Sequence, residues 1–257
     1  MRTPFPEEVD SFDSMDLSLS FDERLDTLHC GSWKFLQKKR GYRFSVDPLL
    51  LVHFVRIRKN DHVIDLGTGC GIIPILLSQR GRDQRFVGVE IQEDLAGLAQ
   101  RNVVLNRLEH QVSILQQDFR RLRSFFPPGS FHVVLSNPPY HRVRSGRINP
   151  SHEKAVARHE INGTLEDLIS MTSYLLPPKG RFYVIYPAAR AVDLIASLRV
   201  KQLEPKQLQF VYPRSNGPAK FVLAEAVKAS GVELMIRPPL IIDPMNGGTN
   251  KHKEERP

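Results

Sequence analysis

A strand, a tight turn and a helix are predicted where the sequence reads Val63-Ile-Asp-Leu-Gly-Thr-Gly-Cys-Gly-Ile-Ile. Gly67, Gly69 and Gly71 let the backbone turn sharply and approach a ligand closely. A dinucleotide-binding loop would have a glycine in place of Ile72, and its pyrophosphate would be repelled by Asp65 at the end of the strand. Since Asp65 would attract an ammonium group, the loop favours a positively charged cofactor without phosphate.

Two further acidic residues follow the next two predicted strands. Glu90 ends the second strand, 19 residues after Gly71, where its carboxylate can accept hydrogen bonds from both hydroxyls of a ribose. Asp118 follows the third strand, where it can accept a hydrogen bond from the amine of an adenine whose ring packs on Phe119. One carboxylate after each of three consecutive strands indicates a cofactor that contains a nucleoside.

The fourth predicted strand runs into the segment Asn137-Pro-Pro-Tyr. Pro138 and Pro139 cannot continue a sheet ladder, so the chain leaves the sheet at its carboxyl edge, where open α/β sheets bind ligands. Asn137 should face the cofactor there, and its side-chain oxygen and the Pro138 carbonyl can accept the two protons of an NH2 group, which favours a pyramidal, more nucleophilic nitrogen. Tyr140 offers a flat face on which a flipped base can stack. The four residues therefore form the predicted catalytic segment.

The segment 141–160 directly after Tyr140 is basic, with five Arg or Lys residues against two Glu. Such a segment beside an active site is suited to phosphate contacts with a nucleic acid, although a solvated loop with no ligand is the alternative. His152 and His159 have no accompanying cluster of Cys or carboxylate residues, so no metal site is predicted. The predicted substrate-binding residues, besides Tyr140, are Arg142, Arg144, Arg147, Lys154 and Arg158.

The elements that must position these residues alternate in type from Asp61 onward, which predicts βαβ units and a buried parallel sheet. Strands are expected at 62–66, 85–90, 112–116, 131–136, 181–186, 207–212 and 220–227, and helices near 71–80, 92–106, 165–176 and 189–199. Residues 24–29 and 33–37 flank a Cys30-Gly31 turn and predict a β-hairpin. A further helix is expected to begin at Pro48, with Asp47 able to cap it.

Composition places the chain among globular proteins, with 257 residues, 41% hydrophobic and 25% charged. No segment approaches the roughly 20 apolar residues of a membrane-spanning helix, and the N-terminus lacks an export signal, so a cytoplasmic location without a membrane partner is expected. Cys30 and Cys70 are too few for a disulfide framework and should both be reduced. No oligomeric state is predicted.

Charge is distributed unevenly along the chain. Residues 1–28 carry eight acidic and two basic side chains, a balance of −6, whereas the whole chain carries +8. The remainder is therefore strongly basic, as a phosphate-binding protein requires. The predicted organisation is a disordered acidic leader at 1–20, a hairpin extension at 21–46, a catalytic domain at 47–245 and a disordered tail at 246–257.

The glycine loop, the acidic strand ends and Asn-Pro-Pro-Tyr together resemble the Rossmann-like amino methyltransferases that use S-adenosyl-L-methionine, over residues 47–190. This resemblance implies an α/β fold with a seven-stranded, mostly parallel sheet, helices on both of its faces and the hairpin as an N-terminal extension. It also implies S-adenosyl-L-methionine as the cofactor. The acceptor in these enzymes is an NH2 group of adenine, cytosine, guanine or glutamine.

A closer resemblance spans residues 24–243 and rests on four stretches, Gly41-Tyr-Arg-Phe-Ser-Val-Asp-Pro, Asn137-Pro-Pro-Tyr, Ala157-Arg-His-Glu, and Tyr212-Pro-Arg with Ala219-Lys-Phe-Val-Leu-Ala-Glu-Ala. They are similar to the bacterial tRNA (adenine-N6)-methyltransferases that modify the adenine beside the anticodon of a valine tRNA. The resemblance implies an RNA substrate, tRNA in particular, and places Phe44 and Asp47 over the cofactor. The acidic leader and the basic tail are not part of this family's pattern.

Two other classes of function remain open at this point. The same Asn-Pro-Pro-Tyr loop can hold the amide of a glutamine side chain in a translation release factor, or an amino group of rRNA or DNA. A non-enzymatic RNA-binding module is disfavoured, because Asp65, Glu90, Asp118 and Asn137 are all present.

Overall fold

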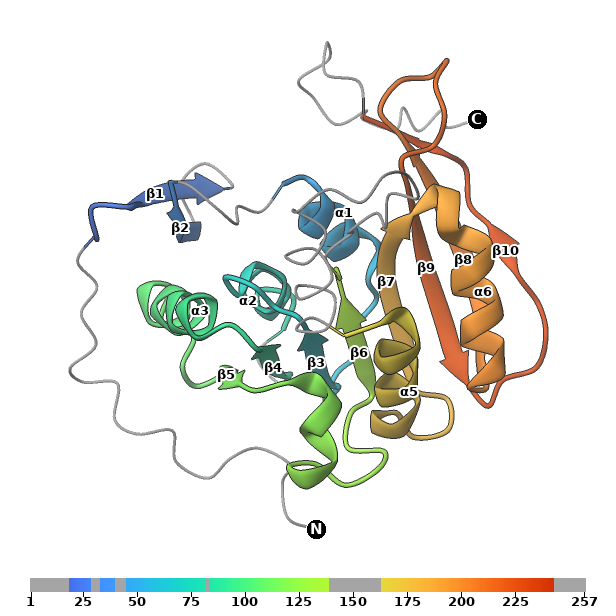
Figure 1. Cartoon of the computed structure of the whole chain (residues 1–257), viewed down its shortest axis with the longest axis horizontal. Coiled ribbons are helices and arrows are strands. Elements are labelled where there is room, and N and C mark those ends of the chain that lie inside the picture. The colour runs from blue at the N-terminus through green and yellow to red at the C-terminus, as the bar shows by residue number, and fades with distance from the viewer. Residues whose placement is uncertain (1–18, 29–32, 40–44, 82–83, 139–162, 243–257) are drawn as a thin grey trace, which may run out of the picture.

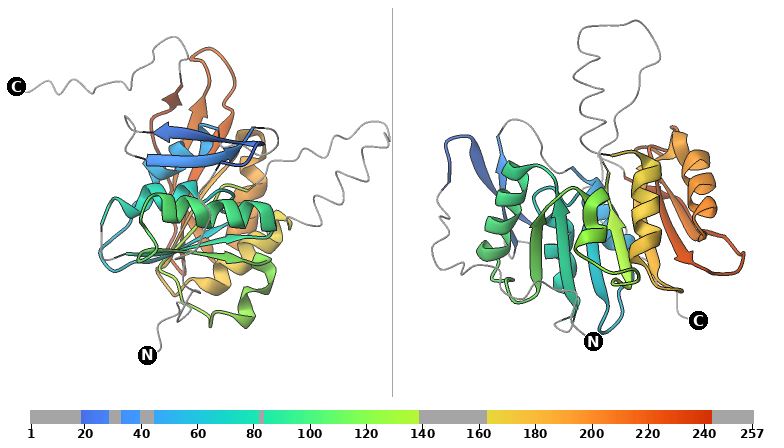
Figure 2. Two further views of the ribbon diagram at one scale, coloured as in Figure 1. Left: turned by 90° about the vertical axis from the view of Figure 1, so that its left-hand side faces the viewer. Right: turned by 60° about the horizontal axis from the view of Figure 1, so that its bottom comes forward.

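The structure is a computed structural model that describes residues 19–28, 33–39, 45–81, 84–138 and 163–242. The leader and tail expected at 1–20 and 246–257 lie outside these ranges, apart from residues 19 and 20. The hairpin expected near the N-terminus is present, since β1 (Glu23–Leu28) pairs antiparallel with β2 (Trp33–Lys38). It lies alongside helix α3 (Glu93–Leu105), as Figure 2 shows.

A nine-stranded sheet forms the centre of the molecule, with strand order β10-β8-β9-β7-β6-β3-β4-β5 and β11 paired to β8 (Figure 1). Strands β3 to β7 are mutually parallel, whereas β9 runs antiparallel to both β7 and β8. The bounds are β3 (His62–Leu66), β4 (Arg85–Glu90), β5 (Val112–Gln116), β6 (Val133–Ser136), β7 (Arg181–Pro187), β8 (Leu203–Tyr212), β9 (Phe221–Lys228), β10 (Met235–Ile236) and β11 (Leu240–Ile241).

The strand order reverses at β3, which has β4 on one side and β6 on the other. The chain adds β4 and β5 in one direction and then returns to add β6 and β7 in the other. Open α/β sheets bind their ligands at the carboxyl ends of the strands around such a switch point. The fold therefore places the glycine loop after β3 and the Asn137 segment after β6 at the same location.

Helices cover both faces of the sheet. One face carries α1 (Asp47–Phe54), α2 (Ile72–Ser78) and α3, and the other carries α5 (Leu165–Leu175), α6 (Ala191–Val200) and the short 3-10 helix η2 (Phe119–Ser124). Alternation within β3 explains this layering, because Val63 packs into the first hydrophobic cluster and Ile64 into the second. The predicted fold class is confirmed.

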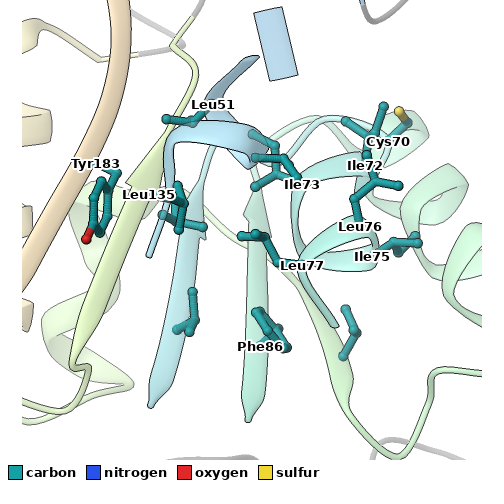
Figure 3. Packing of buried hydrophobic residues seen from close by; sticks show 14 of the residues in the cluster. Leu51, Cys70, Ile72, Ile73, Ile75, Leu76, Leu77, Phe86, Leu135 and Tyr183 are labelled. Carbon is teal, nitrogen blue, oxygen red and sulfur yellow. The ribbon is translucent and has the colours of Figure 1, made fainter. Parts of the chain in front are cut away.

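The hydrophobic cluster beneath α2 fixes the start of that helix behind the glycine loop. Figure 3 shows Ile73 and Leu77 of α2 lying above the sheet near Phe86, with Leu51 of α1 close by. All residues of α2 are buried, so this helix is held by packing rather than by caps. The N-terminal end of α2, and the loop that leads into it, are therefore rigidly placed.

Several boundaries differ from the sequence-based expectations. Strand β6 begins at Val133 rather than Phe131, and β8 begins at Leu203, four residues earlier than expected, with a register shift between Pro205 and Gln207. The two-residue strands β10 and β11 extend the sheet beyond the seven strands predicted, both parallel to β8. In the part of the chain that the structure describes, no helix combines the length and apolarity needed to cross a membrane.

Candidate active site

The carboxyl ends of β3 and β6 are joined directly beside the two predicted functional loops. Asp65 of β3 aligns with Leu135 of β6, and the Ser136 hydroxyl donates a hydrogen bond of 2.8 Å to the Leu66 carbonyl. Gly67 and Asn137 are the residues that follow these two partners. The structure thus brings the glycine loop and the half-buried Asn137 and Pro138 together at the switch point.

The glycine loop is tied to the end of β4. The backbone amides of Gly67 and Thr68 both donate to the Val89 carbonyl at 2.9 Å. Gly67, Gly69 and Gly71 all have positive φ angles, of 78°, 59° and 80°, a backbone conformation that L side chains rarely adopt. A side chain at Gly71 would also be crowded, because its Cβ would lie 3.2 Å from Cβ of Ala99.

Asp65 is buried in this loop with no cationic partner among the described residues to compensate its charge. Its side chain is 1% exposed, and neither carboxylate oxygen has a well-aligned hydrogen-bond partner among the described residues. Burial, with a smaller contribution from the nearby Glu90 carboxylate, raises the pKa of Asp65 to about 7, although the Thr68 hydroxyl opposes this shift. A cationic ligand at this position would supply the missing partner.

Glu90 lies at the end of β4, the strand next to that of Asp65, and its carboxylate can accept further hydrogen bonds. Its Oε2 accepts a hydrogen bond of 2.9 Å from the Gly69 amide, and its Oε1 accepts one of 2.9 Å from the Gln92 amide. A carboxylate has about four acceptor positions, so these two bonds orient the group without saturating it. The remaining positions suit a pair of hydroxyls, which is the predicted role of Glu90 toward a ribose.

Asp118 sits after β5 at the same edge but is engaged with Arg120. It caps η2 by accepting 2.9 Å from the Arg120 amide, and the Arg120 guanidinium contacts both of its oxygens at 2.7–3.0 Å. Burial alone would raise the pKa of Asp118, but the side-chain and backbone hydrogen bonds from Arg120 outweigh it and lower the pKa. Binding of an adenine amine by Asp118 stays a prediction, and it requires Arg120 to give up at least one of these contacts.

Phe119, predicted to pack on the adenine, lies against Gly163. A Cβ added at Gly163 would come within 2.7 Å of the Phe119 ring, and this glycine has a φ of 75°. Gly163 immediately precedes Thr164, which begins α5 with a capping box formed with Asp167. The start of α5 therefore sets the position of the Phe119 ring.

The interpretation of Asp47 as a helix cap is wrong. Val46 occupies the N-cap position of α1, Asp47 is the first helical residue, and no side-chain capping hydrogen bond is present. The Asp47 carboxylate is instead half-buried, its Oδ1 has no hydrogen-bond partner among the residues that the structure covers, and burial raises its pKa. The other expectation, that Asp47 lies over the cofactor, stays a prediction.

The remaining predicted site residues lie outside the described ranges. They are Phe44, Pro139, Tyr140, Arg142, Arg144, Arg147, Lys154 and Arg158. Their roles stay predictions. Within the described ranges, no group of three or more His, Cys, Asp or Glu residues is arranged to hold a metal ion.

Two residues at the site were not anticipated from the sequence. The Thr68 hydroxyl is buried without a partner in the described part of the chain, beside Asp65. Asn102 of α3 donates a hydrogen bond of 2.9 Å to the Cys70 carbonyl in the middle of the glycine loop. A threonine between glycines and an asparagine inside a helix carry no local signal of such roles.

Comparison with known proteins identifies the relatives of this chain. The model of the family described as "Methyltransferase small domain" matches residues 46–189. The tRNA1(Val) (adenine(37)-N6)-methyltransferase of Bacteroides thetaiotaomicron is 31% identical over 150 residues, which cover 58% of this chain and 61% of that protein. The enzyme of the same name from Porphyromonas gingivalis is 32% identical over 166 residues, covering 64% of each chain. The chain thus matches about three fifths of the length of these curated relatives.

Solved structures share the fold at lower identity. A protein of Agrobacterium tumefaciens described as a predicted O-methyltransferase superposes with a TM-score of 0.62 at 23% identity, covering 80% of this chain and 90% of that chain. Geranyl diphosphate C-methyltransferase from Streptomyces coelicolor gives a TM-score of 0.54 at 15% identity, covering 70% of this chain and 78% of that chain. These likenesses support the Rossmann-like architecture and carry no information on the substrate.

Proposed function

This chain belongs to the methyltransferase small domain family, and on that premise we propose that it transfers a methyl group from S-adenosyl-L-methionine to the N6 amine of an adenine in tRNA. The observation that carries the proposal is the meeting of two kinds of group at the switch point. Asp65, which has no cationic partner in the described part of the chain, and Glu90, which has acceptor positions left, lie at the ends of neighbouring strands, and Asn137 and Pro138 follow the strand on the other side of β3.

The donor set fits S-adenosyl-L-methionine rather than a phosphate-bearing cofactor. Asp65 would pair with the ammonium of the methionine moiety, and Glu90 would accept hydrogen bonds from the ribose hydroxyls. Asp118 would accept from the adenine amine once Arg120 has moved aside. When bound, this cofactor supplies an electrophilic methyl group on a sulfonium.

Asn137 and Pro138 prepare the acceptor nitrogen. The lone pair of an adenine N6 amine is delocalised into the ring, so the nitrogen is a poor nucleophile until it pyramidalises. Two fixed acceptors, the Asn137 side-chain oxygen and the Pro138 carbonyl, would hold the two amine protons and favour that geometry. No strong base is needed first, because the nitrogen becomes acidic only after methylation and can then release its proton to solvent or to a neighbouring acceptor.

The choice of tRNA rests on relatives and on charge. The relatives from Bacteroides thetaiotaomicron and Porphyromonas gingivalis both carry tRNA1(Val) and adenine 37 in their names. The five basic residues within 141–160 follow the catalytic segment directly and would contact the phosphate backbone, while Tyr140 would stack on the flipped adenine. Because tRNA is the proposed substrate, the reaction would take place in the cytoplasm.

A glutamine side chain is the second candidate acceptor, because Asn137 and Pro138 present acceptors that suit an amide NH2 equally well. The two candidates separate in one assay. Methyl transfer from isotopically labelled S-adenosyl-L-methionine is measured into total RNA and into total protein, with the Asn137→Ala variant as the background control.

Identification of the product completes the test. We expect label in RNA, recovered as N6-methyladenosine by nucleoside mass spectrometry, and loss of that nucleoside at position 37 of a valine tRNA in a strain without this protein. Label in protein alone would replace adenine by glutamine as the acceptor. Absence of label in both pools would exclude the proposed reaction.

A further inference from the structure

The N-terminal hairpin is attached to α3 and its C-terminal end by two asparagine side chains, whose amides make hydrogen bonds with backbone groups on the edge of β2. The Leu36 amide donates to Asn102 Oδ1 at 2.7 Å, and Asn102 Nδ2 donates back to the Leu36 carbonyl at 3.1 Å. One helical turn further, Asn106 makes the same pair of bonds with Lys34, at 3.1 and 2.7 Å. Asn102 and Asn106 lie one helical turn apart on the same side of α3 and its C-terminal end, and their spacing equals that of Leu36 and Lys34 along the edge of β2.

Only one of these asparagines also reaches the glycine loop. The second N–H of Asn102 Nδ2 donates to the Cys70 carbonyl at 2.9 Å, whereas the second N–H of Asn106 returns to the Asn102 carbonyl at 2.7 Å. The Asn102 side chain is completely buried. Asn102 therefore connects the hairpin and the loop within one amide group, and Asn106 does not.

The bond to Cys70 fixes a peptide plane in the loop. The peptide between Cys70 and Gly71 is held at both ends, because its carbonyl accepts from Asn102 and its N–H donates to the Thr68 carbonyl at 3.1 Å. The preceding turn of α3 also packs against this peptide, because Ala99 lies next to Gly71. Displacement of Asn102 would leave a buried carbonyl unsatisfied in the middle of this loop.

We propose that Asn102 is a positioning residue which couples docking of the β1–β2 hairpin to the conformation of the cofactor loop, so that the hairpin is a functional part of the cofactor site. This inference rests on the proposed function, in which the loop binds S-adenosyl-L-methionine. All three hydrogen bonds of the buried amide are made together, so that moving the hairpin and moving the Cys70 carbonyl are linked events. Linkage is reciprocal, and a ligand that orders the loop must also favour the docked hairpin.

Two contacts hold the hairpin without touching the loop and serve as controls. Asn106 has the same residue type and the same bonding pattern toward β2. Arg101 forms an ion pair with the largely buried Glu23 of β1, at 2.8 and 2.9 Å to its two oxygens. If hairpin docking alone mattered, loss of either control contact would have the same effect on the ligand as loss of Asn102.

The first test measures the affinity of the full chain for S-adenosylhomocysteine by calorimetry, in the wild type and in the Asn102→Ala and Asn106→Ala variants. We expect about tenfold weaker binding for Asn102→Ala, as for an unsatisfied buried carbonyl. For Asn106→Ala we expect a change within about twofold, because Asn102 and the Arg101–Glu23 ion pair still keep the hairpin docked. Asn102→Ser, which keeps one donor, should fall between them. Equal affinities of Asn102→Ala and the wild type, or equal losses in Asn102→Ala and Asn106→Ala, would overturn the inference.

The second test begins with the wild-type protein, so its main result does not depend on the folding of a variant. Hydrogen exchange of the Lys34 and Leu36 amides is measured in the wild type with and without S-adenosylhomocysteine, and the ligand should slow both. The slowing should persist in Asn106→Ala and disappear in Asn102→Ala. Binding to the wild type without any slowing refutes the coupling alone, whereas no binding to the wild type refutes the proposed cofactor and the coupling with it.

Discussion

Replacing Asp65 by asparagine removes a carboxylate that the ligand-free fold accommodates poorly. The side chain is 1% exposed, its two oxygens have no partner in the described part of the chain, and burial raises its pKa to about 7. Asparagine has nearly the same shape and no charge. We expect Asp65→Asn to stabilise the ligand-free protein at neutral pH and to abolish binding of S-adenosylhomocysteine.

The magnitude follows from the two pKa values of Asp65, 3.8 as the reference for the unfolded chain and about 7 in the fold. Because the folded pKa is the higher one, the unfolded state loses its proton first as pH rises, and the wild-type free energy of unfolding falls between these values. The full difference corresponds to about 4 kcal/mol above pH 7. More than half of it develops between pH 5 and pH 8.

The assay is urea unfolding of wild type and Asp65→Asn at several pH values from 5 to 8. The stability of the variant relative to the wild type should increase steadily with pH across this window. Asp94→Asn, which removes an exposed carboxylate in the first turn of α3, is the matched control for the loss of one charge. A stability difference between Asp65→Asn and the wild type that stays constant with pH would refute the argued burial of an ionisable, unpartnered carboxylate.

Three further predictions test the catalytic, RNA-binding and cofactor contacts separately. Asn137→Ala should lower kcat by on the order of 10²–10³-fold while changing the affinity for S-adenosylhomocysteine little, and an equal loss of both would contradict its role toward the amine. Replacing Arg142, Arg144 and Arg147 together by alanine should weaken RNA binding and flatten its dependence on salt concentration. An unchanged salt dependence would indicate that RNA docks on another surface. Arg120→Ala should tighten S-adenosylhomocysteine binding by up to about fivefold in calorimetry, because it frees the Asp118 carboxylate, and weaker binding would show that Arg120 supports the site instead.

The parallel part of the fold was predictable because its central strands, such as β3 and β4, are buried on both faces and read as continuous apolar runs. Strands β3, β4 and β5 were predicted with the bounds that the structure shows, since each is an apolar run that ends at a turn or a carboxylate. The same regularity places Asp65 and Glu90 at successive strand ends. Side chains alternate between the two faces of each strand, and after β5 the chain returns to place β6 on the other side of β3. This arrangement brings Asn137 to the same edge of the sheet as Asp65 and Glu90.

The features that the sequence did not reveal depend on contacts between distant residues. Strands β10 and β11 have two residues each and exist only because β8 offers an edge for pairing. Asp47 was interpreted as a cap from its place before Pro48, but the helix begins one residue earlier in the chain. Asn102 is an unfavourable residue for a helix interior, and its value to the protein appears only when β2 and the glycine loop pack against it.

Several buried polar atoms at the proposed cofactor site lack a hydrogen-bond partner among the described residues. Both oxygens of Asp65, the Thr68 hydroxyl and one oxygen of Asp47 are among the buried side-chain atoms that lack a partner in the described part of the chain. Such atoms destabilise a fold unless a ligand supplies their partners. An ammonium placed at Asp65 would shift that carboxylate back to its charged form, so the energy lost in the ligand-free state becomes part of the selectivity for a cationic cofactor. Stability without ligand and affinity for the ligand therefore oppose each other at Asp65, and the asparagine variant should gain the first only by losing the second.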